Sequence, residues 1–173
     1  MRTAVPLVRR LDPNETGTIE LEFDVPAQAD DAAPPVFIGV RLKGADPTAV
    51  ADAADGLRRA NISAEIHLYR IQESGTTTIR LERSQRIGYG QIEPRALSED
   101  GLVPGLSAID ADFSTMQQAG LLAEGTVYQE LDFAYTPNLP AGRYRTAIRF
   151  VQNREALFAS DAELLVAYTA KGK

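Results

Sequence analysis

Hydrophobic and polar residues alternate along much of this chain, the pattern typical of strands that bury one face. Residues 16–25 are the clearest case, because Ile19, Leu21 and Phe23 fall on one face and charged residues fall between them. The same period of two predicts six further strands, over residues 36–43, 62–71, 76–83, 126–135, 143–150 and 161–169. The pattern therefore predicts strands that are mostly half-buried and half-solvated.

The turn before strand 143–150 carries its own signal. Pro140 fixes its backbone φ, and Gly142 accepts the positive φ that tight turns require. Tyr144 follows two residues later, where β-sandwiches often place a tyrosine whose hydroxyl bonds back to its own loop. We expect such a tyrosine corner here.

One helix interrupts the strands. Asp46 followed by Pro47 is typical of a helix start, and apolar residues then recur at helical spacing, which predicts a helix over residues 46–60. Residues 84–125 are broken by glycines and prolines, and two alternatives stay open for residues 107–119: a short helix, or an irregular loop with a few apolar anchors.

Because a single helix interrupts the strands and strand–helix–strand units do not repeat along the chain, the predicted class is all-β: an antiparallel, immunoglobulin-like β-sandwich of about seven strands with one short inserted helix. A length of 173 residues favours one domain. We expect an N-terminal arm over residues 1–15, the sandwich over residues 16–170 and a tail over residues 171–173.

Composition narrows the function classes. The chain has no cysteine and a single histidine, His67, and it lacks a Gly-x-Ser-x-Gly motif, so no catalytic site, metal site or cofactor is expected. A net charge of −6 argues against nucleic-acid binding and favours a basic partner surface. No apolar run approaches the roughly 20 residues of a membrane span.

Charged residues occupy the outward positions of the late strands. Glu130 and Asp132 lie on one, three arginines (Arg143, Arg145 and Arg149) on the next, and Glu163 on the last. If these strands are neighbours, we expect cross-strand ion pairs on a solvated sheet face.

The segment Leu-Pro-Ala-Gly-Arg-Tyr-Arg at residues 139–145 resembles a turn in an uncharacterised family of bacterial envelope proteins, where the form is Leu-x-Pro-Gly-x-Tyr-Arg. The layout of strand, helix and strand over residues 36–68 is also similar. This chain has Pro-Ala-Gly where the family has Pro-Gly, and it lacks the lipidated cysteine of the family's lipoproteins.

The resemblance implies a non-enzymatic envelope protein, because some members resemble immunity proteins encoded beside type VI secretion lipase effectors. Its partner would be a cognate protein toxin. The implied location is the periplasm, with membrane contact only through a lipid anchor that this chain lacks; a cytoplasmic location and a structural or carbohydrate-binding sandwich stay open as alternatives.

If the chain blocks a toxin, we expect its loops and inserted helix to form the interface. The expected apolar anchors are Tyr89, Phe113 and Met116, and the expected steering charges are Asp52, Asp55, Asp110 and Asp112. Simpler structural roles stay open for the same residues: a strand end at Tyr89, a helix that only caps the sandwich, and a surface carboxylate pair at residues 110–112.

Overall fold

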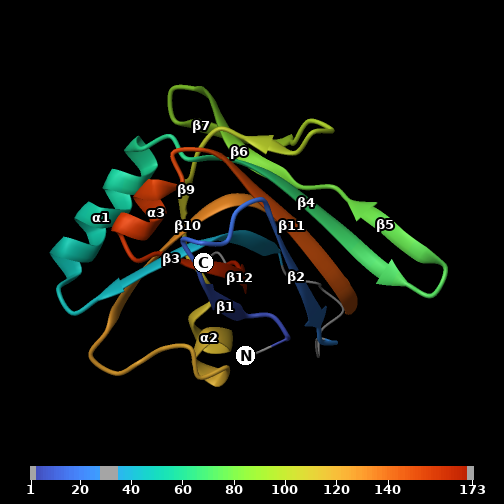
Figure 1. Ribbon diagram of the computed structural model, residues 1–173, viewed down its shortest axis with the longest axis horizontal. Coiled ribbons are helices and arrows are strands. Elements are labelled where there is room, and N and C mark those ends of the chain that lie inside the picture. The colour runs from blue at the N-terminus through green and yellow to red at the C-terminus, as the bar shows by residue number, and fades with distance from the viewer. Residues whose placement is uncertain (1–2, 28–34, 171–173) are drawn as a thin grey trace.

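Two antiparallel sheets face each other in the computed structural model, which describes residues 3–27 and 35–170 (Figure 1). One sheet has seven strands, in the order β1 (Leu7–Arg10), β12 (Glu163–Tyr168), β3 (Val36–Gly44), β10 (Val127–Thr136), β6 (Glu82–Gly88) and β7 (Gln91–Ala96), with β9 (Ser107–Ile109) also paired to β10. The other has five, in the order β2 (Thr18–Val25), β11 (Gly142–Gln152), β4 (Ser63–Gln72) and β5 (Gly75–Ile79), with β8 (Leu102–Val103) paired to β4.

The predicted sandwich class is therefore confirmed, although the described residues form twelve strands rather than about seven. The additional strands are β1 and β6 to β9, most of them short and without a long alternating pattern. The long strands β2, β3 and β4 alternate between the two sheets, as do β10, β11 and β12. Within each of these two sets of three, strands that follow each other in sequence therefore lie in opposite sheets, across the core.

The main core lies between the sheets. The residues predicted to face inward on β2, including Ile19, Leu21 and Phe23, are all buried. Phe23 stacks against Tyr144 of β11 with ring centroids 6.0 Å apart. Inward-facing side chains of β3, β10 and β12 complete this cluster from the opposite sheet. The residues that the alternating pattern predicted to face inward are therefore the ones that the two sheets bury between them.

Tyr144 forms the expected corner. Its hydroxyl donates a hydrogen bond of 2.7 Å to the carbonyl of Pro140, while its ring is fully buried. The bond closes the loop between β10 and β11 and satisfies a backbone carbonyl that the turn would otherwise leave unpaired.

Replacing Tyr144 with phenylalanine is expected to lower the free energy of unfolding by about 1 kcal/mol, because one partly buried hydrogen bond is lost while the ring stays packed. Urea denaturation followed by circular dichroism measures this change. Tyr89→Phe is the matched control, because Tyr89 is fully exposed. Equal stability of Tyr144→Phe and wild type would contradict a structural role for the corner.

The predicted inserted helix is confirmed as α1 (Pro47–Arg59). Asp46 caps it by accepting a hydrogen bond of 3.1 Å from the amide of Thr48. A short helix, α3 (Glu155–Ala159), lies beside α1 in Figure 1, where the sequence predicted only a connection. Asn153 joins the two helices, since its Nδ2 donates to the carbonyl oxygens of Ala60 and Asn61 at 3.0 and 3.2 Å.

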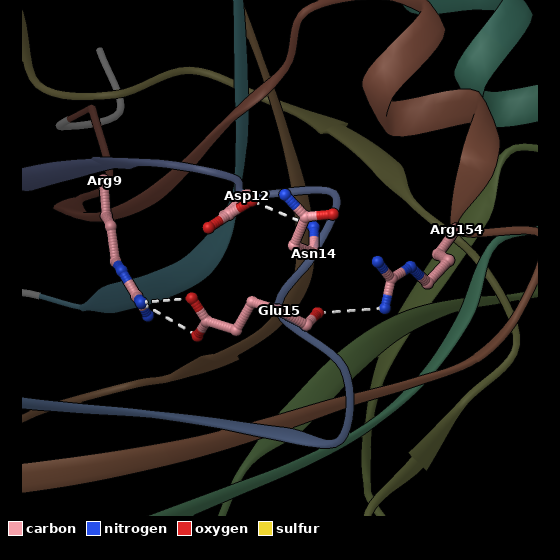
Figure 2. A network of polar contacts seen from close by, with 5 residues as sticks. All are labelled: Arg9, Asp12, Asn14, Glu15 and Arg154. Atoms are coloured by element: carbon pink, nitrogen blue, oxygen red, sulfur yellow. Dashed lines mark hydrogen bonds and ion pairs between the residues drawn. The ribbon is translucent and has the colours of Figure 1, made fainter.

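The described part of the predicted N-terminal arm belongs to the sandwich. β1 pairs with β12 over Leu7 to Arg10. Figure 2 shows how the following loop is held: Arg9 bonds both carboxylate oxygens of Glu15 at 2.8 and 2.6 Å, and Arg154 Nη1 donates to the Glu15 carbonyl at 3.0 Å. Residues 7–10 of the predicted arm thus form a strand of the sandwich, and residue 15 is bonded to it. The predicted tail at residues 171–173 lies outside the described residues.

The predicted ion pairs among the late strands are wrong, because those strands belong to different sheets. β11 lies in the five-stranded sheet, while β10 and β12 lie in the seven-stranded one. Arg143 instead pairs with Glu22 and Asp24 of β2, at 3.0 Å each. Arg149 pairs with Glu65 of β4 at 2.6 Å, and Arg145 lies over the Tyr69 ring at 5.4 Å.

A second, smaller core covers the outer face of the seven-stranded sheet. It joins Phe37 of β3 and Leu165 and Ala167 of β12 to Met116, which lies on α2 (Phe113–Gln118). Of the two alternatives for residues 107–119, the short helix is present as α2, and the strand β9 precedes it. Because this segment lies over the sheet, β12 is buried on both faces rather than one.

Candidate functional site

The residues predicted to form an interface lie on three separate elements. Figure 1 shows α1 at the left, the β6–β7 hairpin at the top and α2 at the bottom of the molecule. Asp52 and Asp55 lie on α1, Tyr89 at the hairpin turn, and Asp110, Asp112, Phe113 and Met116 on and before α2. The structure thus brings the α2 group together and separates it from the other two.

The β6–β7 hairpin projects with little attachment to the sheet. Its strand β6 joins β10 through the single pair Tyr135 and Glu82, and every residue from 84 to 92 is exposed. Tyr89 is fully exposed at the turn, and Ile87 and Ile92 beside it are 49% and 67% exposed. Three large apolar side chains therefore lie within six residues at a projecting tip.

Local sequence explains the hairpin turn. Gly90 has a φ of 74°, and Gly88 and Gly90 flank Tyr89, so the turn leaves its ring without neighbours. Sequence reasoning found Tyr89 from these glycines but missed Ile87 and Ile92. Ile87 lies at the alternate position before Tyr89, so it could have been assigned to the same tip, whereas Ile92 stands between the polar Gln91 and Glu93 and carried no comparable signal.

A groove of about 570 Å³ runs beside α2. Its walls come from α2, from the loop after it and from the start of β10; the lining residues are Ala111, Phe113, Met116, Gln117, Leu122, Ala123, Glu124, Thr126, Tyr128 and Glu130. Phe113 is 66% exposed at its edge. Met116 is only 1% exposed, so its prediction as a surface anchor is wrong: it fixes α2 to the sheet.

Buried polar contacts hold the loop after α2 in place. Arg41 Nη1 of β3 donates a bond of 2.6 Å to the Leu121 carbonyl, and Nη2 lies 3.4 Å from Glu163. The Arg41 guanidinium also lies 4.4 Å from the centre of the Tyr128 ring. The Tyr128 hydroxyl in turn accepts a bond of 2.8 Å from the Ala123 amide. These contacts shape the groove from the sheet side.

Carboxylates near the groove differ in their roles. Asp112 caps α2 by accepting a hydrogen bond of 3.0 Å from the Thr115 amide, so its carboxylate stabilises the start of the helix. Glu130 is half-buried, and its pKa lies above the usual value, first because of burial and then because of the nearby Asp110 charge. Asp110 is exposed and lies at a second depression, against Tyr135 and Ser84.

The predicted steering charges on α1 lie on its exposed side. Asp52 and Asp55 face solvent, while Val50, Ala54 and Leu57 face the core. Asp55 is 3.5 Å from Arg58, so part of its charge is balanced locally. Since Arg58 and Arg59 lie in the last turn, α1 presents a surface of mixed charge rather than an acidic one. An exposed pair such as Asp55 and Arg58 contributes little to stability.

Within residues 3–27 and 35–170, no three histidine, aspartate or glutamate side chains group closely enough to hold a metal ion. No helix in the same residues is both long and apolar enough to cross a lipid bilayer. His67 lies on β4 beside Tyr69, with ring centroids 6.2 Å apart. The surfaces that stand out in this part of the chain are therefore the hairpin tip and the α2 groove.

No protein-family model matches the chain, and no curated protein matches it in sequence. Among solved structures, a crystal structure of a protein from Sulfurospirillum deleyianum is similar, with 8% sequence identity and a TM-score of 0.44. The similarity covers 96% of this chain and 98% of that one.

Proposed function

We propose that this chain is a non-enzymatic binding protein of the bacterial envelope, and more specifically a periplasmic immunity protein that binds and blocks a cognate secreted toxin. The resemblance at residues 139–145 supplies the toxin class, a type VI lipase-like effector. The observation that carries the binding role is the projecting β6–β7 hairpin with Ile87, Tyr89 and Ile92 exposed at its tip.

The hairpin has the physical properties of a contact surface. Exposed large apolar side chains are costly to hydrate, and three of them gathered at one tip favour a binding site over chance exposure. The tip is convex, so its partner surface must be concave. An enzyme's active-site opening has that shape, and a hairpin inserted there would block substrate by occupying the space.

The structural or carbohydrate-binding alternative would be favoured by a row of exposed aromatic rings on one sheet face. In the described residues, the large aromatic side chains that are mostly exposed are Tyr89 and Phe113, and they lie on different elements. A protein partner with a cavity for one projecting tip accounts better for this distribution.

The proposal is tested by capturing the partner and assaying it. The tagged chain is used as bait in lysate of its source bacterium, and any stoichiometric partner is purified and its hydrolytic activity is measured with and without the chain. We expect a toxin-like enzyme that the chain inhibits at a one-to-one ratio. Recovery of only envelope glycans or structural proteins, or of an enzyme that stays fully active, would overturn the immunity role.

Replacing Tyr89 with alanine is expected to weaken the captured complex by about tenfold or more, the loss typical of a central aromatic anchor. The free energy of unfolding should not change, because the side chain is fully exposed. Isothermal titration calorimetry measures the affinity. Val151→Ala, which removes an exposed apolar side chain from β11, is the control and should bind normally. Unchanged affinity of Tyr89→Ala would place the interface elsewhere.

A further inference from the structure

The groove beside α2 combines an apolar wall with acidic groups. Phe113, Met116 and Leu122 supply the wall, and Glu124 and Glu130 are the carboxylates that line it. Its volume of about 570 Å³ exceeds that of any single side chain and falls in the range of ligand-binding pockets. In Figure 1, α2, which the groove borders, lies at the opposite end of the molecule from the β6–β7 hairpin.

The charge in this groove is unbalanced. Among the described residues that line it, the ionisable groups are Glu124, Glu130 and Tyr128. The nearby cation, Arg41, is bonded to the Leu121 carbonyl and to Glu163 behind the Tyr128 ring. In the described chain Glu130 is half-buried and forms no ion pair within 4.0 Å. The Ala111 amide and Arg41 favour its charged form, but burial and Asp110 outweigh them and raise its pKa, so a cation bound beside it would stabilise the carboxylate. A carboxylate in that position favours a cation as its ligand.

We propose that this groove receives a lysine or arginine side chain of the partner protein, with the aliphatic stem against Phe113 and Leu122 and the cationic end at Glu130. This inference deepens the proposed function and rests on it, since it names the chemistry of one partner residue. It makes the groove a second contact, separate from the hairpin tip.

The chemistry of the groove matches such a side chain in both of its parts. Lysine and arginine bury their methylene stems along apolar surface while the charged end reaches a polar group. Phe113, exposed at the edge, is also an aromatic ring of the kind that attracts a cation to its face. The net charge of −6 adds a long-range attraction for a basic partner surface. An anionic side chain would meet repulsion from Glu124 and Glu130.

The test uses a small probe on the isolated full chain. Hexylammonium chloride, which has an apolar stem and a cationic end, is titrated and followed by amide NMR shifts; hexanoate and 1-hexanol are the anionic and neutral comparisons. We expect shifts at groove residues with hexylammonium and much weaker binding of the other two. Glu130→Gln should weaken hexylammonium binding about tenfold, the effect of one charge-assisted hydrogen bond.

Glu20→Gln is the matched control, because Glu20 is exposed on β2 in the other sheet, and it should bind hexylammonium like wild type. Absence of shifts at the groove, equal binding of all three probes, or unchanged binding by Glu130→Gln would overturn the inference. Because the probe needs no protein partner, these outcomes are distinct from a failed capture experiment, which would overturn the immunity role alone.

Discussion

Replacing Gly39 with alanine is expected to lower the free energy of unfolding by about 3 kcal/mol or more, or to prevent folding altogether. A Cβ at this position would lie 1.9 Å from the Leu131 carbonyl oxygen and 2.7 Å from the Asp132 Cα. Both are backbone atoms of β10, so no side-chain rotation can relieve the contact. The approach is close because the register between β3 and β10 shifts after Asp132, which is paired with Gly39.

Urea denaturation and the yield of soluble protein measure this effect. Gly56→Ala is the matched control, because a Cβ there meets nothing within 4 Å inside α1. That change should instead raise the free energy of unfolding by about 0.5–1 kcal/mol, since alanine is the better helix former. If Gly39→Ala were as stable as wild type, β10 would not pair with β3 in this register.

Replacing Asp132 with asparagine is expected to stabilise the protein at pH 8 by up to about 4 kcal/mol and to have little effect near pH 4. Asp132 is only 7% exposed, and burial raises its pKa from the ordinary 3.8 to about 7, against smaller opposing effects of its own amide and of Arg83. At 1.36 kcal/mol per pKa unit, this rise of about three units in the pKa gives the upper limit of about 4 kcal/mol.

The sign of this pH dependence follows from the number of protons that the folded and unfolded states bind. Between about pH 4 and pH 7 the folded protein holds a proton on Asp132 that the unfolded chain has released, so this carboxyl lowers stability as the pH rises through that range. Asparagine does not ionise, and the difference between variant and wild type should therefore grow across the same range. Urea denaturation at several pH values measures it.

Asp52→Asn, on the exposed side of α1, is the control for Asp132→Asn and should change the free energy of unfolding little. A difference between Asp132→Asn and wild type that is constant from pH 4 to pH 8 would contradict burial of an ionisable group at this position.

The candidate site was only partly predictable from sequence. Tyr89 was found because two glycines flank it, and its full exposure agrees with that prediction. Met116 was misassigned, because its exposure depends on whether the segment before β10 lies against the sheet or away from it. Glu130 was interpreted as a member of a solvated charged face, since its place on the same face as Asp132 in β10 carries no signal of the segment that covers it.

What the sequence by itself determined is the inner half of the sandwich. Period-two alternation specified the core-facing residues of β2, β3, β10 and β12, because a one-residue slip would turn those side chains away from the space between the sheets. It did not specify that β3 and β12 are buried on their outer face as well. The cap at Asp46 and the turn before Tyr144 were likewise specified locally, by residues within a few positions of each other.

Only the tertiary structure decided the outer half. It separated the arginines of β11 from the carboxylates of β10 and β12, because consecutive long strands cross between sheets and sequence order does not reveal this. It also placed α2 over the outer face of β3 and β12, which creates both the small second core and the groove at Glu130. A six-residue helix has too few turns for a readable period, so its position depends on long-range contacts that no local pattern encodes.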